Sequence, residues 1–354
     1  MSSAKKQIRV TQRDIARLSK VSQATVSRVL AGDDRVDVLT SERVKQVMRE
    51  HNYRPDVLAR SLRSRRSGLI GLVVKRPAGG LHDDPFFANL ASEIMDFLSS
   101  TPYHLCMEMV TDRTQEAVYD ELLRARRVDG LILVESEARD ERIQRLQADR
   151  FPFVLIGNPD EIQNADELDQ PWSVDNDNVA AGELAAKHLV DSGFKKIGIL
   201  GGPPAVTVSE DRIEGYRRAI AGKQDRPMIW HSDFGLSAAK DTAISILCGD
   251  DRPDALVVLD DFMAMGVVLA ARVCHAKIPD DLALVSFNDS SLCHVLDCGL
   301  TSTSLNIREI VQVACGRLLR IIEDKPVAGE RRVIVPTQLK VRGSSLPSRG
   351  LITV

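Results

Sequence analysis

Short polar side chains and one arginine gather on one face of a helical pattern near the N-terminus, in the segment VTQRDIARLSKVSQATVSRVL (10–30). Val26, Val29 and Leu30 recur at helical spacing and are expected to face inward. The side chains left toward solvent are Gln23, Ala24, Thr25, Ser27 and Arg28. Amides, hydroxyls, methyl groups and guanidinium groups are the chemistry with which proteins contact base edges and phosphates. The pattern therefore indicates a helix that contacts DNA.

A second helix is predicted just before this one, and the two together form a helix-turn-helix. Thr11 stands three residues before Asp14, which is the spacing of a capping box. Ile15 and Leu18 give the first helix an apolar face, and Ser22 is placed to cap the second helix. The alternative is a surface pair of helices that binds no DNA.

The following segment contains a third helix and then a short arginine-rich stretch. Asp37 precedes VLTSERVKQVMREHNY, whose apolar residues recur at helical spacing and predict a helix that ends near Asn52. In residues 54–68, a proline that is tolerated only at a helix start is followed by Arg60, Arg63, Arg65 and Arg66. Such a segment is too short to be a stable helix by itself. We interpret it as a linker that becomes ordered in contact with an anionic partner.

Positive charge is concentrated in the N-terminal part of the chain. The 354 residues carry a net charge of −3, but residues 1–67 hold 16 Lys and Arg against 7 Asp and Glu, and the remainder holds 31 against 43. A basic head on an acidic body indicates that only the head meets a polyanion, with a solvated basic face as the alternative. The length suits a small head and a two-lobed body.

From Leu69 onward, apolar strands alternate with amphipathic helices. The predicted strands cover residues 69–75, 104–110, 129–134, 151–157, 195–200, 255–259 and 282–287. The predicted helices include residues 86–99, 114–126, 178–192, 209–221, 237–248 and 262–275. This alternation is typical of parallel sheets covered by helices on both faces. Two such series predict two Rossmann-like lobes with a cleft between them, where ligands bind beyond the carboxyl ends of the strands.

The composition disfavours a membrane protein and a metalloprotein. No run approaches the roughly 18 consecutive apolar residues of a membrane span, and MSSAKKQIRV has no apolar signal-peptide core. The six cysteines form no CxxC pair and the seven histidines form no HExxH motif, so we expect free thiols, no metal and no cofactor. We therefore expect a soluble, cytoplasmic protein.

The whole chain resembles the LacI/GalR family of bacterial transcription regulators. In the head, the resemblance is carried by residues 10–30 and by NYRPDVLARSL (52–62). In the body it is carried by RRVDGLIL (126–133), VDNDNVAAGELAAKHL (174–189), DRIEGYRRAI (211–220), RPDALVVLDDFMAMG (252–266) and IPDDLALVSFND (278–289). The segments VVLDDFMAMG, ALVSFND and RRVIVPTQL are most similar to maltose-type and other α-glucoside-type repressors. The resemblance implies an all-α helix-turn-helix head and an α/β body with two Rossmann-like lobes of the periplasmic-binding-protein type.

For the head, the resemblance implies distinct roles for the DNA-contacting residues. Gln23 and Ala24 are expected to face base edges in the major groove, and Arg28 is expected to bind a guanine or the DNA backbone. Thr25 and Ser27 are expected to hold phosphates.

For the linker, the resemblance at residues 55–63 implies a hinge helix. Leu62 matches an apolar wedge that enters the minor groove and kinks the DNA, with packing between head and body as the alternative. Arg60 and, in the head, Thr11 are further expected DNA contacts. Two hinge helices on DNA imply a homodimer and a pseudo-palindromic double-stranded operator. The C-terminal VRGSSLPSRGLITV lacks leucine heptads, so we expect a dimer rather than a tetramer.

For the body, the resemblance implies a small-molecule effector in the cleft, and the residues at matching positions suit a sugar. The expected hydrogen-bonding residues are Asp112, Asn158, Asp177, Arg212, Asp260 and Asn288. The expected apolar contacts are Phe86, Phe234 and Phe262. Asp177 is equally suited to capping the helix that follows it, and Phe234 to a place in the core. A purine stacked on the aromatic rings is the alternative effector.

The predicted organisation is a head at 1–53, a hinge at 54–68, a two-lobed body at 69–345 and a tail at 346–354. Within the body, the N-lobe is predicted at 69–172 and 303–328, and the C-lobe at 173–302 and 329–345.

The expected function is repression of a carbohydrate-utilisation operon, with operator affinity controlled by a sugar that acts as inducer or corepressor. Paired acids at Asp260–Asp261 and Asp175/Asp177 are compatible with a glycosidase. However, two closing lobes joined to a DNA-binding head suit binding rather than turnover, so we expect no enzyme. A solute-binding protein is the other alternative, and the basic head disfavours it.

Overall fold

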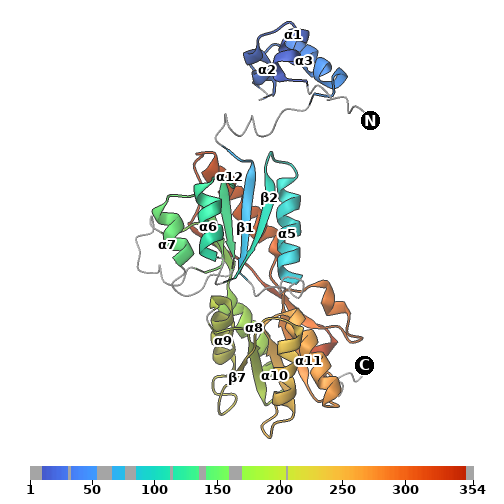
Figure 1. Cartoon of the computed structure of the whole chain (residues 1–354). Coiled ribbons are helices and arrows are strands. Elements are labelled where there is room, and N and C mark those ends of the chain that lie inside the picture. The colour runs from blue at the N-terminus through green and yellow to red at the C-terminus, as the bar shows by residue number, and fades with distance from the viewer. Residues whose placement is uncertain are drawn as a thin grey trace, which may run out of the picture. The chain divides into compact units, whose positions relative to one another are not determined.

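The computed structural model describes residues 10–30, 33–53, 66–75, 85–111, 115–134, 141–158, 170–204 and 206–347. The chain divides into two units, residues 1–67 and residues 68–354, which we call the head and the body. The head is helical, and the body contains two sheets covered by helices (Figure 1). None of the helices in the described part of the chain combines the length and the apolar character that crossing a bilayer requires.

Side chains next to each helix start set the three helices of the head. Thr11 and Asp14 form a reciprocal capping box, because the Asp14 N–H donates to Thr11 Oγ1 and the Thr11 N–H donates to the Asp14 carboxylate. The Thr25 N–H donates to Ser22 Oγ at 3.0 Å, and Asp37 caps the third helix. The helices are α1 (Gln12–Leu18), α2 (Gln23–Leu30) and α3 (Val38–Glu50).

The core of the head is small and consists of one apolar side chain from each helix and their neighbours. Ile15, Val26 and Val44 are fully buried against one another. Leu18 was expected on the apolar face of the first helix, but its side chain is 43% exposed. The reason is that the seven-residue α1 packs through Ile15 and Ala16, and Leu18 lies beyond that contact in the last turn.

The first sheet of the body has six parallel strands in the order β11-β5-β4-β3-β1-β2. The strands are β1 (Leu69–Lys75), β2 (His104–Val110), β3 (Gly130–Val134), β4 (Phe153–Ile156), β5 (Ser173–Asn176) and β11 (Arg332–Val335). The helices are α5 (Pro85–Leu98), α6 (Gln115–Arg124), α7 (Glu141–Ala148) and α12 (Ile307–Ile322). Alternate strand residues pack on α5 and α12 on one face and on α6 and α7 on the other. We call this sheet with its helices the first lobe.

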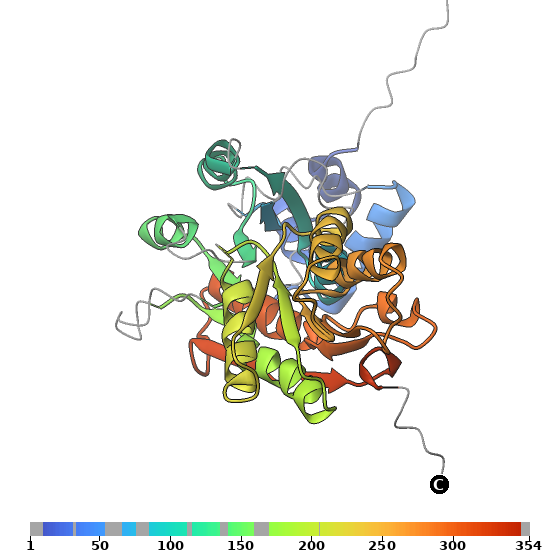
Figure 2. The ribbon, with the colours of Figure 1, turned by 90° about the horizontal axis from the view of Figure 1, so that it is seen from below.

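The second sheet has the order β12-β10-β9-β8-β6-β7, and its edge strand β12 is antiparallel to β10. The strands are β6 (Ile197–Gly201), β7 (Met228–His231), β8 (Ala255–Val258), β9 (Ala283–Phe287), β10 (Thr301–Ser304) and β12 (Gln338–Lys340). The helices are α8 (Asn178–Asp191), α9 (Thr207–Ile220), α10 (Leu236–Leu247) and α11 (Asp261–Val273), with 3-10 turns η4 (Ser291–His294) and η5 (Gly343–Ser345). Helices α8 and α9 pack on one face and α10 and α11 on the other, as Figure 2 shows. This is the second lobe.

The strand pairing moves three boundaries between the lobes away from their predicted positions. Strands β5 and β11 were expected in the second lobe, but β5 pairs with β4 and β11 pairs with β5 in the first sheet. Residues 303–304 were expected in the first lobe, but they belong to β10, which pairs with β9 in the second sheet. These strands are placed by hydrogen bonds to a neighbouring strand, which the order of apolar segments does not reveal.

One side chain joins the three segments in which the chain crosses between the lobes. The crossings follow β5, β10 and β11. Asn176 ends β5, and its Nδ2 donates to the carbonyl oxygens of Leu305, at 3.1 Å, and Val335, at 2.8 Å. Asn176 is buried, so these two bonds are shielded from water. The crossings are therefore held together at one point.

Helices α8 and α9 approach so closely that two glycines have no room for a side chain. A Cβ atom on Gly215 would lie 2.0 Å from the carbonyl oxygen of Val179, and one on Gly182 would lie 2.2 Å from the carbonyl oxygen of Arg212. Both obstacles are backbone atoms, which cannot rotate out of the way. This close contact fixes α9 against α8.

We expect Gly215→Ala to lower the free energy of unfolding of the body by at least about 2 kcal/mol, because a helix must shift to admit the methyl group. The control is Gly316→Ala in α12, where a Cβ would meet nothing within 4 Å. That substitution is expected to be neutral or to stabilise by up to about 1 kcal/mol through helix propensity. Urea unfolding followed by tryptophan fluorescence measures both, since the two tryptophans, Trp172 and Trp230, lie in the body. Equal effects of the two substitutions would contradict the close packing.

Candidate functional site

A cavity with about 740 Å³ of empty space, part of it open to solvent, lies at the carboxyl ends of strands from both lobes. The first lobe contributes Phe86, Val134, Ile156, Gly157, Asp175, Asn176 and Ile310. The second lobe contributes Asn178, Thr207, Val208, Arg212, Phe234, Leu259, Asp260 and Asn288, and Leu305 lies in a crossing segment. Carboxyl ends of parallel strands are the usual ligand-binding edge of such sheets. A ligand in this cavity would contact both lobes at once.

Arg212 supplies a buried positive charge to the cavity. Its Nε donates to Asn178 Oδ1 at 3.2 Å, and its Nη1 donates to the Leu259 carbonyl at 2.7 Å. The guanidinium also lies 4.2 Å from the centre of the Phe287 ring. Burial lowers the pKa of Arg212 to about 10, which leaves the group charged at neutral pH. In the described part of the chain it makes these two hydrogen bonds, so N–H groups remain for a bound oxygen atom.

Asp175 supplies a carboxyl group whose protonation changes near neutral pH. Burial raises the pKa of Asp175 to about 7, although the Asn176 N–H donates to its carboxylate at 2.7 Å. The Asn178 side-chain amide donates to the same carboxylate at 3.1 Å. Asp175 can therefore accept hydrogen bonds from a ligand when ionised and donate one when protonated.

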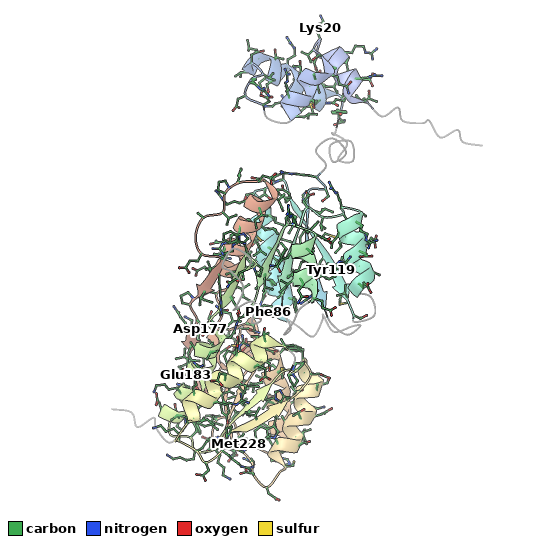
Figure 3. The ribbon with its side chains drawn as sticks, turned by 90° about the vertical axis from the view of Figure 1, so that its left-hand side faces the viewer. Lys20, Phe86, Tyr119, Asp177, Glu183 and Met228 are labelled. Carbon is green, nitrogen blue, oxygen red and sulfur yellow. The ribbon has the colours of Figure 1, made fainter. Side chains whose placement is uncertain are left out.

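Two phenylalanines give the cavity apolar surface. Phe86 belongs to the first turn of α5 and packs edge-to-face on Phe87, with the ring centres 5.4 Å apart. Figure 3 shows Phe86 at the end of the first lobe that faces the second lobe. Phe234 precedes α10, and its ring lies against Gly202, where a Cβ would come within 3.3 Å of it. Apolar rings beside polar groups suit a ligand that has both apolar faces and hydroxyls.

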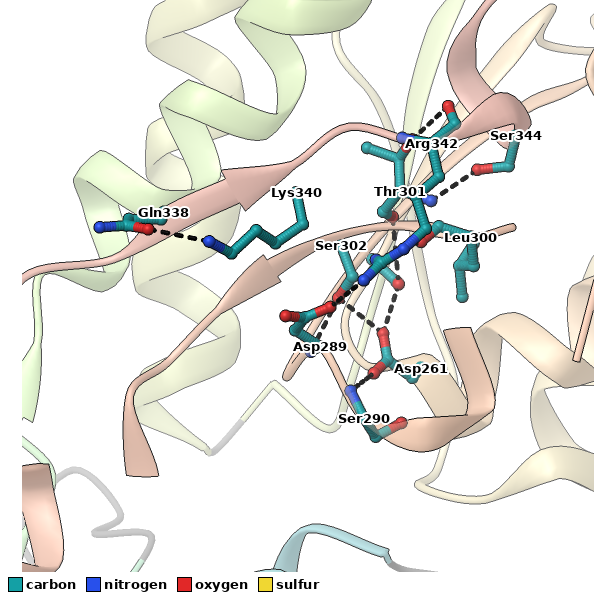
Figure 4. A network of polar contacts seen from close by, with 11 residues as sticks. Asp261, Asp289, Ser290, Leu300, Thr301, Ser302, Gln338, Lys340, Arg342 and Ser344 are labelled. Atoms are coloured by element: carbon teal, nitrogen blue, oxygen red, sulfur yellow. Dashed lines mark hydrogen bonds and ion pairs between the residues drawn. The ribbon is translucent and has the colours of Figure 1, made fainter. Parts of the chain in front are cut away.

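Asp260 and Asn288 stand on two segments that are held together behind the cavity. Asp260 caps α11, with its Oδ1 accepting the Met263 N–H at 2.7 Å, and Asn288 has a φ of 100°. The neighbouring Asp261 is buried, and its carboxylate accepts hydrogen bonds from Ser286 Oγ, Ser302 Oγ and the Ser290 N–H. This network joins the start of α11 to the loop that follows β9, and an ion pair of 2.7 Å between Arg342 and Asp289 continues it (Figure 4).

The cavity contains five of the side chains that the sequence predicted for a ligand site, namely Phe86, Arg212, Phe234, Asp260 and Asn288. Asp177 is exposed, and its carboxylate accepts the Ala180 N–H at 2.9 Å, so it caps α8. Asn158 is buried and Phe262 is half-buried, and both lie outside the lining, while Asp112 lies outside the described residues.

The structure adds four polar residues to the lining that were not expected in the ligand site. They are Asn176, Asn178, Thr207 and Asp175, of which Asp175 was considered only as one of a pair of glycosidase acids. The signal that could have found three of them is the run of polar residues in VDNDN, at the junction between a strand and a helix.

In the head, α2 presents the side chains that were expected to contact DNA. Gln23, Ala24 and Arg28 are exposed, and Thr25 and Ser27 are partly exposed. Thr11 is exposed but engaged in the capping box of α1. Arg60 and Leu62 lie outside the described residues.

Among the described residues, no group of three or more His, Cys, Asp or Glu side chains is arranged to hold a metal ion. The described side chains of the cavity offer hydrogen-bonding groups, charge and apolar surface.

The raised pKa of Asp175 predicts a pH-dependent difference between the protein and its Asp175→Asn variant. The folded protein holds this proton more tightly than the unfolded chain, so the resulting stability is complete below about pH 4 and is lost as pH rises through about 7. Relative to Asp175→Asn, the protein should therefore become less stable between pH 5 and pH 8 in urea unfolding.

The control is Asp120→Asn, because the hydrogen bond from Arg145 lowers the pKa of Asp120 and this carboxylate stays ionised throughout that range. Its effect on stability should be the same at both pH values. If the protein and Asp175→Asn have parallel pH profiles, Asp175 does not titrate in this range.

Comparisons with known proteins match both the head and the body of this chain. Residues 11–56 match the family of bacterial regulatory proteins, lacI family, and residues 186–345 match a periplasmic binding protein-like domain. The ribose operon repressor of Halalkalibacterium halodurans is 32% identical over 333 residues, which are 94% of this chain and 96% of that protein.

Two solved structures are similar in fold across nearly the same length. The transcriptional regulator CelR–cellobiose complex has a TM-score of 0.71 at 25% identity and covers 95% of this chain and 100% of its own. The lac repressor dimer bound to operator and the anti-inducer ONPF has a TM-score of 0.77 at 25% identity. This match covers 95% of this chain and 99% of the lac repressor chain. The chain belongs to the lacI family of bacterial regulatory proteins.

Proposed function

We propose that this protein is a transcriptional repressor of a carbohydrate-utilisation operon. It binds a pseudo-palindromic operator as a homodimer through its head, and a sugar in the cavity of the body controls its affinity for DNA. The observation that carries this proposal is the convergence of Arg212, Asp175, Asp260 and Asn288 with two phenylalanines in one cavity between two lobes.

DNA binding by the head is supported by the exposed face of α2 and by charge. Gln23 and Arg28 are long polar side chains exposed on this helix, and Ala24 beside them offers a methyl contact. Residues 1–67 hold 16 Lys and Arg against 7 Asp and Glu, so phosphate attraction strengthens binding at low salt. The lac repressor structure is a dimer on its operator, which supports the same arrangement for this relative.

A sugar as effector is supported by the chemistry of the cavity. Carboxylates and amide oxygens accept hydrogen bonds from hydroxyl groups, and the Arg212 guanidinium donates to them. The Phe86 and Phe234 rings supply surfaces on which the apolar face of a sugar ring can rest. The structural relative CelR is complexed with cellobiose, and the relative in sequence represses a ribose operon.

Control of DNA binding follows from the position of the cavity between the lobes. A ligand that contacts both lobes stabilises one relative position of the lobes over another. The resulting change in operator affinity can be no larger than the difference in ligand affinity between the two relative positions of the lobes. The three crossings held by Asn176 are the points about which this change takes place.

The experiment that tests this proposal is thermal unfolding in a panel of sugars and purines. A ligand at a hundredfold its dissociation constant adds about 2.7 kcal/mol to the folded state, which shifts the melting temperature measurably. Maltose and other α-glucosides, cellobiose, ribose, adenine and guanine form the panel. A shift with a sugar supports the proposal, and operator binding with and without that sugar then distinguishes an inducer from a corepressor. A response to purines without any response to sugars would overturn the sugar assignment.

Arg212→Ala is expected to weaken binding of the sugar found in this panel by at least about tenfold, because the variant loses a buried charged donor. Operator affinity without sugar should change by less than about threefold. The control is Arg217→Ala on the same helix, where the arginine is exposed and paired with Glu214. Calorimetry with the sugar measures the first effect. A variant that binds sugar as tightly as the parent would show that Arg212 is outside the site.

Arg28→Ala is expected to cost about 1–3 kcal/mol in operator binding and to relax the preference for one base pair. Arg17→Ala is the control, since Arg17 is exposed on α1 and paired with Asp14. Fluorescence anisotropy on operator variants measures both. Unchanged affinity and base preference in Arg28→Ala would refute its role in reading DNA.

A further inference from the structure

Two cysteines meet at the ends of neighbouring helices, away from the cavity. Cys248 is the C-cap of α10 and Cys274 is the C-cap of α11. Their Sγ atoms lie 3.4 Å apart, although the residues are 26 positions apart in the chain. Cys248 is exposed and Cys274 is partly exposed, so small molecules can reach the pair. We propose that these thiols are a redox-modification site, at which a peroxide produces a reversible disulfide between α10 and α11.

The backbone holds both cysteines in fixed positions. The Cys248 N–H donates to the Ile244 carbonyl at 3.0 Å, and the Cys274 N–H donates to the Ala270 carbonyl at 2.9 Å. Both residues therefore continue the hydrogen bonding of their helices. Their side chains meet because the two helices end side by side. The contact therefore depends on the packing of the helices and not on the conformation of a loop.

Close packing of the two helices strengthens this placement. A Cβ on Gly266 in α11 would lie 2.4 Å from the Leu236 carbonyl oxygen and 2.9 Å from the Lys240 N atom in α10. Cys274 and Cys248 each lie eight residues, about two turns, beyond Gly266 and Lys240. A disulfide needs an S–S distance of about 2.05 Å, so the sulfur atoms must approach by roughly 1.4 Å, within reach of side-chain rotation.

The other cysteines lack this arrangement. All six cysteines lie among the described residues. Of these six, Cys248 and Cys274 are the two whose sulfur atoms are in contact. Cys293 and Cys315 are buried, and burial raises the pKa of both thiols to about 12, which keeps them protonated and unreactive. Cys106 and Cys298 are partly exposed. Cys298 therefore serves as a matched control for accessibility without a thiol partner.

The two thiols have different roles in the proposed reaction. Burial, followed by the contact with Cys248, raises the pKa of Cys274, so the more exposed Cys248 is the thiol that the peroxide meets first. The Cys248 sulfur attacks one peroxide oxygen, the O–O bond breaks, and a sulfenic acid and one water form. The Cys274 sulfur then attacks the sulfenic sulfur, loses its proton and releases a second water as the S–S bond forms. Hydrogen peroxide is reduced by two electrons and the two thiols are oxidised by two.

The experiment uses the full-length protein treated with hydrogen peroxide. Remaining thiols are then alkylated, and the protein is digested without reduction for mass spectrometry. We expect a cross-linked peptide pair that contains Cys248 and Cys274, the loss of two of the six thiols, and full recovery after dithiothreitol. The cross-link closes a loop between two helices, so the melting temperature of the oxidised protein should rise by roughly 5–10 °C. This readout involves no effector and no DNA, so it is independent of the proposed function.

Single serine variants test the assignment to this pair. Cys298→Ser should form the same cross-link to the same extent, whereas Cys248→Ser and Cys274→Ser should form none and show no peroxide-dependent rise in melting temperature. A cross-link between two protein molecules, a cross-link through another cysteine, or complete alkylation of Cys248 and Cys274 after peroxide would each overturn the proposal. So would irreversible oxidation of both thiols without an S–S bond.

Discussion

The body of this protein depends on the way Asn176 binds two other crossing segments. Leu305 directly follows β10 and Val335 is the last residue of β11, so both carbonyl groups lie where a strand ends. Buried carbonyls need a donor, and the Asn176 amide carries two N–H groups in the geometry required. The same side chain lines the cavity. The residue that joins the crossings would therefore also contact a ligand bound between the lobes.

Burial also shifts the pKa values of the charged groups in the cavity. Arg212 and Asp175 are both shifted toward their neutral forms, since the pKa of the arginine falls and that of the aspartate rises. Arg212 stays charged because Asn178, the Leu259 carbonyl, the Phe287 ring and nearby carboxylates compensate for lost water. The donors and acceptors are thus held in place before any ligand arrives, which reduces the ordering that binding would require.

The sequence predicted features that depend on near neighbours. The capping box of Thr11 and Asp14 and the cap at Ser22 each involve residues three positions apart, and both are present. The long apolar strands were also recognised, because burial on both faces leaves continuous apolar runs. Strands β5 (SVDN) and β10 (TSTS) were missed, since their polar side chains carry no apolar pattern. Their hydrogen-bonding neighbours in the sheet define them instead.

By itself, the sequence determined the helix-turn-helix, the two α/β lobes and five of the side chains that line the cavity. The tertiary structure decided which of two neighbouring acids, Asp175 or Asp177, lines the cavity. Asp175 lies on β5 and lines the cavity, whereas Asp177 is exposed and caps α8. The sequence pattern alone does not show which of the two carboxylates faces the cavity. They differ because the pairing of β5 with β4 and β11, which are distant in sequence from each other, sets where the strand ends and the helix begins.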